Sequence, residues 1–423
     1  MAKMNPRGAV IADECVADLE KIDGALKCVP VSPMPRYVAL LFAVACGLAV
    51  SNIYYAQPLL DALASEFGIS HASVGIVITV TQICYALGLF FLVPLGDSQN
   101  QRLLIVGMML FSAVALIVVG FAPTIPVLFT GLAVVGMLAV VTQVLVSYSS
   151  TLAAPNERGR IVGQVTSGVV IGILLARTVA GVFTDLLGWR SVYLVSAALT
   201  LLMAGALFWL LPNYRVEKPS LAYPQLLRSV LELFVQERVL RIRALLAFLI
   251  FTAFSTLWTS LVLPLSSPPL SLSHTAIGAF GLAGVVGALA AARAGRLADR
   301  GLGQRTTGIA LLLLLVSWLP IRYTEFSLLA LVIGIVLLDL AVQAVHVTNQ
   351  SLIFTVRPEA RSRLTAGYMI FYSIGSSTGS IVSTSIYAYA GWSGVCLFGA
   401  SVSALALLFW ALTLRTSDIV KKE

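Results

Sequence analysis

The stretch LLALVIGIVLLDLAVQAVHVTNQSLI, residues 328–353, decides the fold. It is apolar over most of its length and carries one acidic residue, Asp339, and no lysine or arginine. About 20 apolar residues in a helix cross the roughly 30 Å hydrocarbon core of a bilayer. The stretch therefore predicts a transmembrane helix with a carboxylate near its middle.

The whole chain has the composition of an integral membrane protein. Of its 423 residues, 59% are hydrophobic and 11% are charged, and the mean hydropathy is +0.95. Soluble globular domains are about one quarter charged. The period-two alternation of a membrane β-barrel is absent, so the backbone polar groups must be satisfied within helices. We therefore predict an all-α protein that has the bilayer as its solvent.

Long uncharged runs predict twelve transmembrane helices. The first 35 residues mix acidic and basic side chains and lack the apolar segment of a signal peptide, so we interpret them as a cytoplasmic tail. The predicted spans are 37–59, 74–95, 103–122, 126–150, 161–184, 191–211, 244–264, 276–292, 306–321, 328–353, 364–388 and 394–414.

The basic residues predict the orientation of these spans. With both termini in the cytoplasm, 24 of the 27 lysines and arginines fall on the inside. Arg190 and Arg322 fall in outside loops, and Arg177 falls within a span. Cytoplasmic loops of membrane proteins are enriched in lysine and arginine. The sequence therefore predicts a multi-pass protein of the inner (cell) membrane.

The spans divide into two related halves around the charged segment 213–243, in which Gln225 to Arg243 resembles an amphipathic helix at the membrane surface. Asp97 and Asp299 follow the second and eighth spans, 202 residues apart. Three further landmarks repeat at an offset of 203, namely Pro155 with Pro358, Gly172 with Gly375, and GW at 188–189 with GW at 391–392. A duplicated six-helix unit explains this repetition. The predicted domains are 1–35 (tail), 36–212 (first bundle), 213–243 (linker), 244–415 (second bundle) and 416–423 (tail).

With these features the chain resembles the major facilitator superfamily of twelve-helix transporters, and within it the bacterial drug:proton antiporters. Their signature after helix two is G-x-L-x-D-R-x-G-R-R. The first copy here matches it at Leu95, Asp97 and Arg102, and departs at Val93, Ser98, Asn100 and Gln101. The second copy matches at Gly295, Leu297, Asp299, Arg300 and Arg305. Leu132 stands where these antiporters have an arginine in helix four, and their helix-five motif is represented loosely by GVVIGILLARTVAG at 168–181.

The resemblance implies a proton-coupled exporter of a small organic compound that alternates between two open states. It implies a monomer in membrane lipid, without a cofactor or a bound metal. It also implies a cytoplasmic gate, formed by Asp97, Arg102, Gly295, Asp299, Arg300 and Arg305. Asp97 is expected at the start of helix eleven and Asp299 at the start of helix five, where the helix dipoles favour a carboxylate. The alternative is a pair of charged turns that only fix the topology.

Asp339 and Arg177 are the only charged residues predicted deep within the membrane. Such charges are costly and normally face a partner or a water-filled cavity. Asp339, Gln343, His346 and Gln350 are spaced four, three and four residues apart, so they share one helical face. Three roles for Asp339 stay open: proton coupling, a fixed structural pair with Arg177, or recognition of a charged substrate. His346 is a candidate proton relay or a hydrogen-bonded cavity histidine.

Other polar and aromatic residues on the predicted cavity helices are candidates for substrate contact, although each can also serve as interhelical glue. They are Asn52, Tyr55, Gln57, Gln82, Tyr85, Gln143, Trp258, Gln343, Asn349 and Gln350. Glycine pairs at 168 and 172, and at 375 and 379, predict close helix packing. In the resembling family these helices meet across the two halves.

Other classes of protein fit less well. A membrane enzyme would need a catalytic cluster, whereas His71, His274 and His346 are scattered. No lysine lies between Lys27 and Lys218, so a P-loop is absent. A sensor on the same fold would usually carry long cytoplasmic extensions. The basic balance reflects orientation and does not indicate nucleic-acid binding. A metabolite importer or proton symporter is the main alternative to an exporter.

Overall fold

The computed structural model describes residues 36–97, 99–153, 157–211, 223–284, 297–354, 356–357 and 360–420. Regular structure within them is entirely helical, as the sequence predicts. The first half contains α2 (Arg36–Tyr54), η1 (Gln57–Leu59), α3 (Leu60–Phe67), α4 (Ile76–Phe91), η2 (Val93–Asp97), α5 (Gln101–Gly120), α6 (Ile125–Leu138), α7 (Val141–Leu152), α8 (Arg158–Leu187) and α9 (Trp189–Leu210). Pro58 accounts for the break between α2 and α3, because proline lacks the N–H that would continue the helix.

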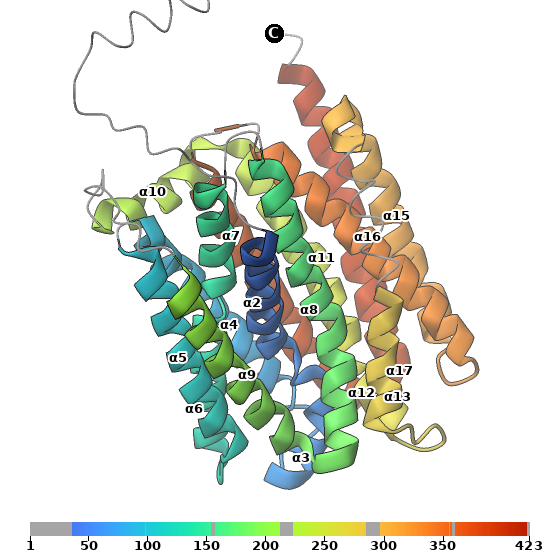
Figure 1. Cartoon of the computed structure of the whole chain (residues 1–423). Helices are drawn as coiled ribbons and strands as arrows, with labels where there is room; N and C mark the ends of the chain where they lie inside the picture. Colours follow the sequence, from blue (N-terminus) through green and yellow to red (C-terminus); the bar gives the residue numbers. More distant parts are fainter. Residues whose placement is uncertain are drawn as a thin grey trace, which may run out of the picture.

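The second half follows the surface helix α10 (Tyr223–Gln236). Its elements are α11 (Arg238–Ser260), α12 (Val262–Ser266), α13 (His274–Ala279), η3 (Phe280–Ala283), η4 (Ala298–Leu302), α15 (Gly303–Arg322), α16 (Leu328–Phe354) and α17 (Arg361–Val420). Figure 1 shows them packed side by side as one bundle, with the C-terminus at one end and α3 at the other. We call the end that contains α3 and the start of α13 the α3 face.

The described residues contain ten helices that are long and apolar enough to cross a membrane. One of these segments, Arg363–Leu414, holds both the eleventh and the twelfth predicted spans. The predicted eighth span lies partly outside the described residues. The seventh predicted span corresponds to α11, which begins at Arg238, inside the predicted linker. Arg243, which the prediction placed in the linker, is buried within this helix.

The surface helix α10 is amphipathic, as its sequence indicates. Leu226, Val230 and Leu233 are its buried side chains, and they recur every three or four residues. The Tyr223 hydroxyl donates to the Phe91 carbonyl oxygen of the first half (2.8 Å). The Phe234 ring lies 5.3 Å from that of Phe371 in the second half. This helix therefore contacts both halves.

The internal repeat is visible in the backbone. Gly188 and Gly391 begin the last helix of each half with φ of +81° and +60°, a region that glycine tolerates better than other residues. A Cβ on Gly172 would lie 2.3 Å from the Gly47 carbonyl oxygen of α2. A Cβ on Gly375 would lie 2.2 Å from the Phe248 carbonyl oxygen of α11. The glycine pairs therefore pack closely, as predicted, against α2 and α11 of their own halves. The helices that carry them also meet the opposite half, because α8 contacts α13 and α17 contacts α4.

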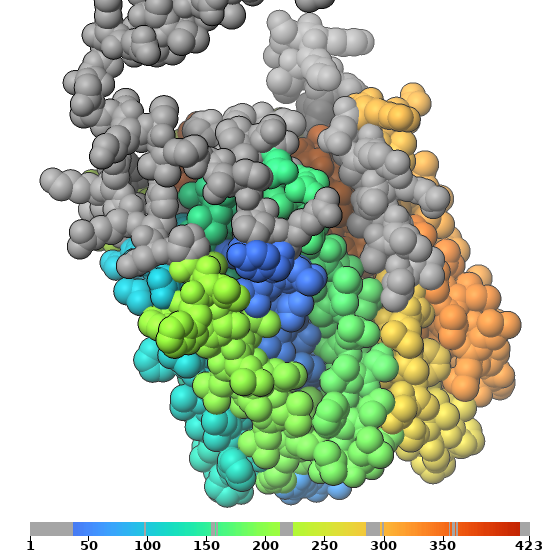
Figure 2. Space-filling model, in the orientation of Figure 1, coloured from blue at the N-terminus to red at the C-terminus, as the bar shows by residue number. Residues whose placement is uncertain are grey.

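The two halves meet near the α3 face. Here α4 packs against α17, and α8 packs against α13. The hydroxyls of Thr79 and Thr178 donate across the halves to the carbonyl oxygens of Ser377 (3.1 Å) and Gly278 (3.0 Å). Figure 2 shows α2 (blue) between α9 and α8, and α8 (green) beside the yellow residues of the second half. Backbone carbonyls thus accept many of the bonds between the halves.

Candidate functional site

Asp339 lies in the middle of α16, with only 5% of its surface exposed. The Trp258 indole N–H of α11 donates to its Oδ1 (3.1 Å). A Cβ on Gly284 would lie 2.6 Å from its Oδ2, so the absence of a side chain at Gly284 makes room for the carboxylate. Asp339 is therefore held by one neutral donor in a confined position.

Arg177 reaches the same cluster from α8 of the other half, and it is 2% exposed. Its guanidinium carbon lies 3.8 Å from the centroid of the Trp258 ring. Its Nε donates to Gln57 Oε1 (2.9 Å), whereas its Nη2 is buried without a hydrogen-bond partner. No ion pair within 4.0 Å joins the described side chains of Arg177 and Asp339. The two charges instead contact different parts of one indole, its face and its N–H.

The cluster is closed in this state. A cavity of about 10 Å³ is lined by Gln57, Pro58, Arg177, Trp258, Leu261, Val262 and Ile277. Such a volume holds about one water molecule. An organic substrate therefore requires the halves to separate before it reaches Arg177 or Trp258.

We expect Arg177→Lys to destabilise the protein by about 1–2 kcal/mol, because an ammonium cannot keep both the planar contact with Trp258 and the bond to Gln57. Thermal unfolding of the purified protein in detergent measures this effect. Arg305→Lys is the matched control, because Arg305 is exposed. Equal melting temperatures for the two variants would contradict the contacts assigned to Arg177.

A second polar cluster lies further along α16. His346 Nδ1 is 3.0 Å from the Tyr368 hydroxyl, and the His346 ring packs edge-on against Phe251 at 5.3 Å. One helical turn away, Arg243 Nη1 donates to Asn349 Oδ1 (3.2 Å). Gln343 and Gln350 of the predicted stripe are half-buried. His346 is thus a hydrogen-bonded histidine in an aromatic setting, one of the two readings that the sequence allows.

The remaining cavity candidates are divided between the centre of the protein and helix contacts. The Gln143 amide donates to the Tyr85 hydroxyl (3.5 Å), and Gln82 Oε1 is buried without a partner. Asn52 accepts from the Ser196 hydroxyl of α9 (2.7 Å). Tyr55 packs edge-on against the Tyr193 ring, also of α9. Asn52 and Tyr55 therefore join α2 to α9 within one half in this state.

The described residues include part of the predicted cytoplasmic gate. Arg102 donates to the Phe208 carbonyl oxygen and lies 4.7 Å above the Phe208 ring, so it contacts α9 of its own half. Arg300 and Arg305 are exposed. Gly295 and the side chains of Asp97 and Asp299 lie outside the described residues, so the expected latch at helices five and eleven stays a prediction.

Sequence reasoning missed three features. Arg243, placed in the linker, is 4% exposed and bound to Asn349. The hydroxyls of Tyr54 and Tyr372 form a buried hydrogen bond between the halves. His274 contacts Asp61 and Asp185 at the α3 face. The signal for the first and third features was a polar group beside the end of an apolar span, whereas Tyr54 and Tyr372 lie within spans and gave no such signal.

Comparison with known proteins agrees with this architecture. The family model described as the Major Facilitator Superfamily matches residues 39–309 and 244–423. The transporter YgaY of Escherichia coli is 49% identical over 371 residues, covering 88% of this chain and 94% of the relative. The multidrug resistance protein MdtG of Proteus mirabilis is 24% identical, covering 88% of this chain and 94% of the relative.

A solved structure shares the fold. The bacterial homologue of the human lysosomal transporter Spinster, inward-facing and unoccupied, aligns with a TM-score of 0.72 at 15% identity. The alignment covers 90% of this chain and 97% of that structure. Together with the family match, the helices and their closed polar centre define a multi-pass membrane transporter. The chain belongs to the Major Facilitator Superfamily, and its fold is that family's twelve-helix bundle.

Proposed function

We propose that this transporter exports a small organic compound in exchange for protons, by alternating access between its two halves. One observation carries the proposal: Asp339 is a buried carboxylate at the junction of the halves, bonded to a neutral indole N–H rather than paired with a cation. A buried carboxylate without such a partner can take up and release a proton as the site opens to each side in turn. The binding of the compound and of the proton would then exclude each other.

The closed state fits one stage of such a cycle. The distribution of basic residues assigns the α3 face to the outside. The halves are joined near that face through Thr79, Thr178 and their carbonyl acceptors. Opening to the outside must break these contacts and the bond between Tyr54 and Tyr372. Trp258 and the other aromatic side chains around Arg177 and His346 would offer apolar surface to an organic compound.

Proton symport is a second candidate, which Arg177 favours. Its buried Nη2 lacks a partner, so an anionic group of a substrate could bind there. Protonation of Asp339 would remove a negative charge near that group. Proton and substrate would therefore bind together and move in the same direction. A sensor without transport activity would show neither coupling.

Inverted membrane vesicles with an acidified lumen test these proposals. A panel of organic compounds is added outside, and a fluorescent dye reports the lumen pH. Export in exchange for protons is expected to raise the lumen pH when a transported compound is added. Symport of a compound that enters with protons would lower it instead. No response to any compound, from vesicles that contain folded protein, would contradict both proposals.

A further inference from the structure

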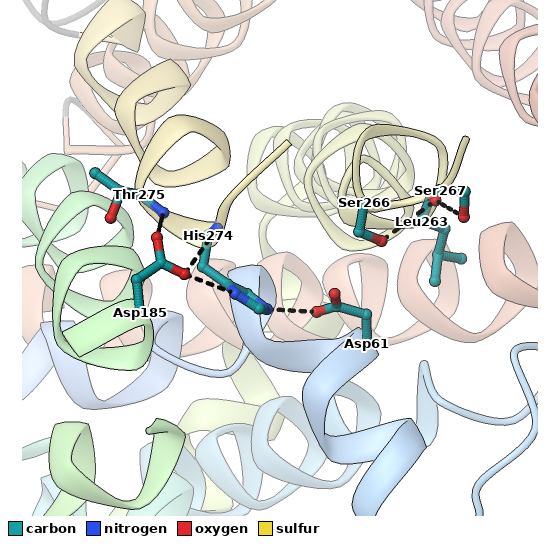
Figure 3. A network of polar contacts seen from close by, with 7 residues as sticks. All are labelled: Asp61, Asp185, Leu263, Ser266, Ser267, His274 and Thr275. Atoms are coloured by element: carbon teal, nitrogen blue, oxygen red, sulfur yellow. Dashed lines mark hydrogen bonds and ion pairs between the residues drawn. The ribbon is translucent and has the colours of Figure 1, made fainter. Parts of the chain in front are cut away.

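A charged cluster lies at the α3 face, apart from the cluster around Asp339, and joins the two halves. His274 begins α13 of the second half. Its Nε2 lies 3.1 Å from Asp61 Oδ1 of α3, and its Nδ1 lies 3.0 Å from Asp185 Oδ1 of α8. Figure 3 shows the imidazole between the two carboxylates, both of which belong to the first half.

Backbone bonds fix the position of His274. The N–H groups of His274 and Thr275 donate to Asp185 Oδ1 (3.2 Å) and Oδ2 (2.7 Å). A Cβ on Gly181 would lie 2.2 Å from the His274 carbonyl oxygen, so α8 and α13 touch closely. The imidazole is therefore held between Asp61 and Asp185 by the packing of the two helices.

The charge around His274 is negative. Asp61 comes from α3 and Asp185 from α8. The charged residue of α8 nearest to Asp185 is Arg177, which belongs to the central cluster. The other elements packed against α13 are η1, η3 and α12, and they carry no charged residue. Glu66 at the far end of α3 is paired with Arg190 of α9. Only an imidazolium can donate to both carboxylates at once.

We propose that His274 is a proton-binding site of the outer face, separate from Asp339, and that its protonation holds the two halves closed on that side. The proposal rests on the alternating access proposed above. Opening to the outside would withdraw α13 from α3 and α8. The imidazolium would then lose both carboxylates, so protonation favours the closed state.

The expected pH dependence follows from this geometry. The hydrogen bond with Asp61 raises the pKa of His274 above its ordinary value in the closed state, and opening would return it to that value. Stabilisation of the closed state is therefore full below the ordinary pKa and is lost as the outer pH rises through the raised one. Each unit of difference between the two pKa values changes the ratio of closed to open states by about tenfold.

The bound proton does not cross the membrane. The side chains of His274, Asp61 and Asp185 remain 23%, 20% and 26% exposed in the closed state. A proton on His274 therefore exchanges with water on the α3 face, even though that side is shut to substrate. His274 would set the probability of opening and leave the number of protons per compound unchanged.

Spin labels that report the width of the outer face test the proposal in the full-length protein. Phe121 and Tyr389 suit this purpose, because they are 68% and 88% exposed and lie in different halves. With both replaced by labelled cysteines in a background without the five native cysteines, pulsed electron resonance measures the distance distribution between pH 5 and 8.5. We expect the population with the longer distance to increase as the pH rises.

His274→Gln is expected to abolish this pH response, because glutamine does not titrate. His71→Gln is the matched control, since His71 is exposed and lies outside the cluster, and it should retain the response. Asp61→Asn leaves the backbone bonds to Asp185 intact, and it should shift the midpoint to lower pH. An unchanged response in His274→Gln, or none in the parent, would overturn the proposal.

This measurement needs no substrate. A parent that responds to pH in the expected way but shows no compound-evoked proton movement would support the site at His274 and contradict the proposed proton exchange. Proton exchange without a pH-dependent distance would do the reverse. The two proposals can therefore fail separately.

Discussion

Asp339→Asn is expected to lower compound-evoked proton release from inverted vesicles at least tenfold, the largest functional effect we predict. The asparagine amide does not bind or release a proton near neutral pH. Its side-chain oxygen can still accept from the Trp258 indole N–H, and it has nearly the volume of the carboxylate beside Gly284. The variant should therefore fold and bind compound while losing the coupling to protons.

Two further measurements separate loss of coupling from loss of the protein. Exchange of labelled compound across the membrane without a pH gradient should persist in Asp339→Asn, because that exchange moves no net protons. Glu232→Gln makes the same chemical change on the exposed surface of α10, where Glu232 is paired with Arg228, and should leave proton release unchanged. Equal proton release in Asp339→Asn and the parent would leave the exporter in place and assign coupling to another group.

The fold could be predicted because its determinants are long-range averages. Apolar length, the sidedness of lysine and arginine, and the offset of 203 residues each sum over many positions. Local exceptions, such as the break at Pro58 or the early start of α11 at Arg238, do not change them. Membrane helices need no partner to satisfy their backbone, so the number of spans follows from composition.

The candidate site was predictable only in part. The spacing of residues 339, 343, 346 and 350 places them on one face of α16. It does not predict which elements that face contacts. Asn52 and Tyr55 also share a face, which in this state contacts α9 through Ser196 and Tyr193. The rotation of a helix about its axis depends on the packing of all its neighbours, which periodicity does not contain.

The contacts of Arg177 and His274 show what else the sequence omits. The depth of Arg177 and Asp339 in their spans allowed a direct pair, yet Arg177 contacts the face of the Trp258 ring and Asp339 contacts its N–H. His274 looked isolated because Asp61 and Asp185 are 213 and 89 residues away. All three lie at ends of helices that reach the α3 face, so their positions beside the ends of the spans and the orientation of those spans were the available signals.

Gly168→Ala is expected to be the most damaging of the small substitutions. A Cβ on Gly168 would lie 2.1 Å from the Ala43 carbonyl oxygen of α2, and the neighbouring atoms within 3 Å are also backbone atoms. Backbone cannot move aside as a side chain does, so α2 and α8 must separate. Overpacking of this kind costs about 1–3 kcal/mol or more, which exceeds the gain of up to about 1 kcal/mol from replacing glycine by alanine in a helix.

Gly163→Ala provides the matched control on the same helix, because a Cβ there meets nothing within 4 Å. It should raise or preserve the melting temperature of the purified protein, whereas Gly168→Ala should lower it and reduce the yield of monodisperse protein. The difference between the two variants isolates the contact between helices, since both make the same change in helix propensity. Equal stability would contradict the close contact between α2 and α8. It would also contradict the position of Arg177, which α8 carries into the centre of the protein.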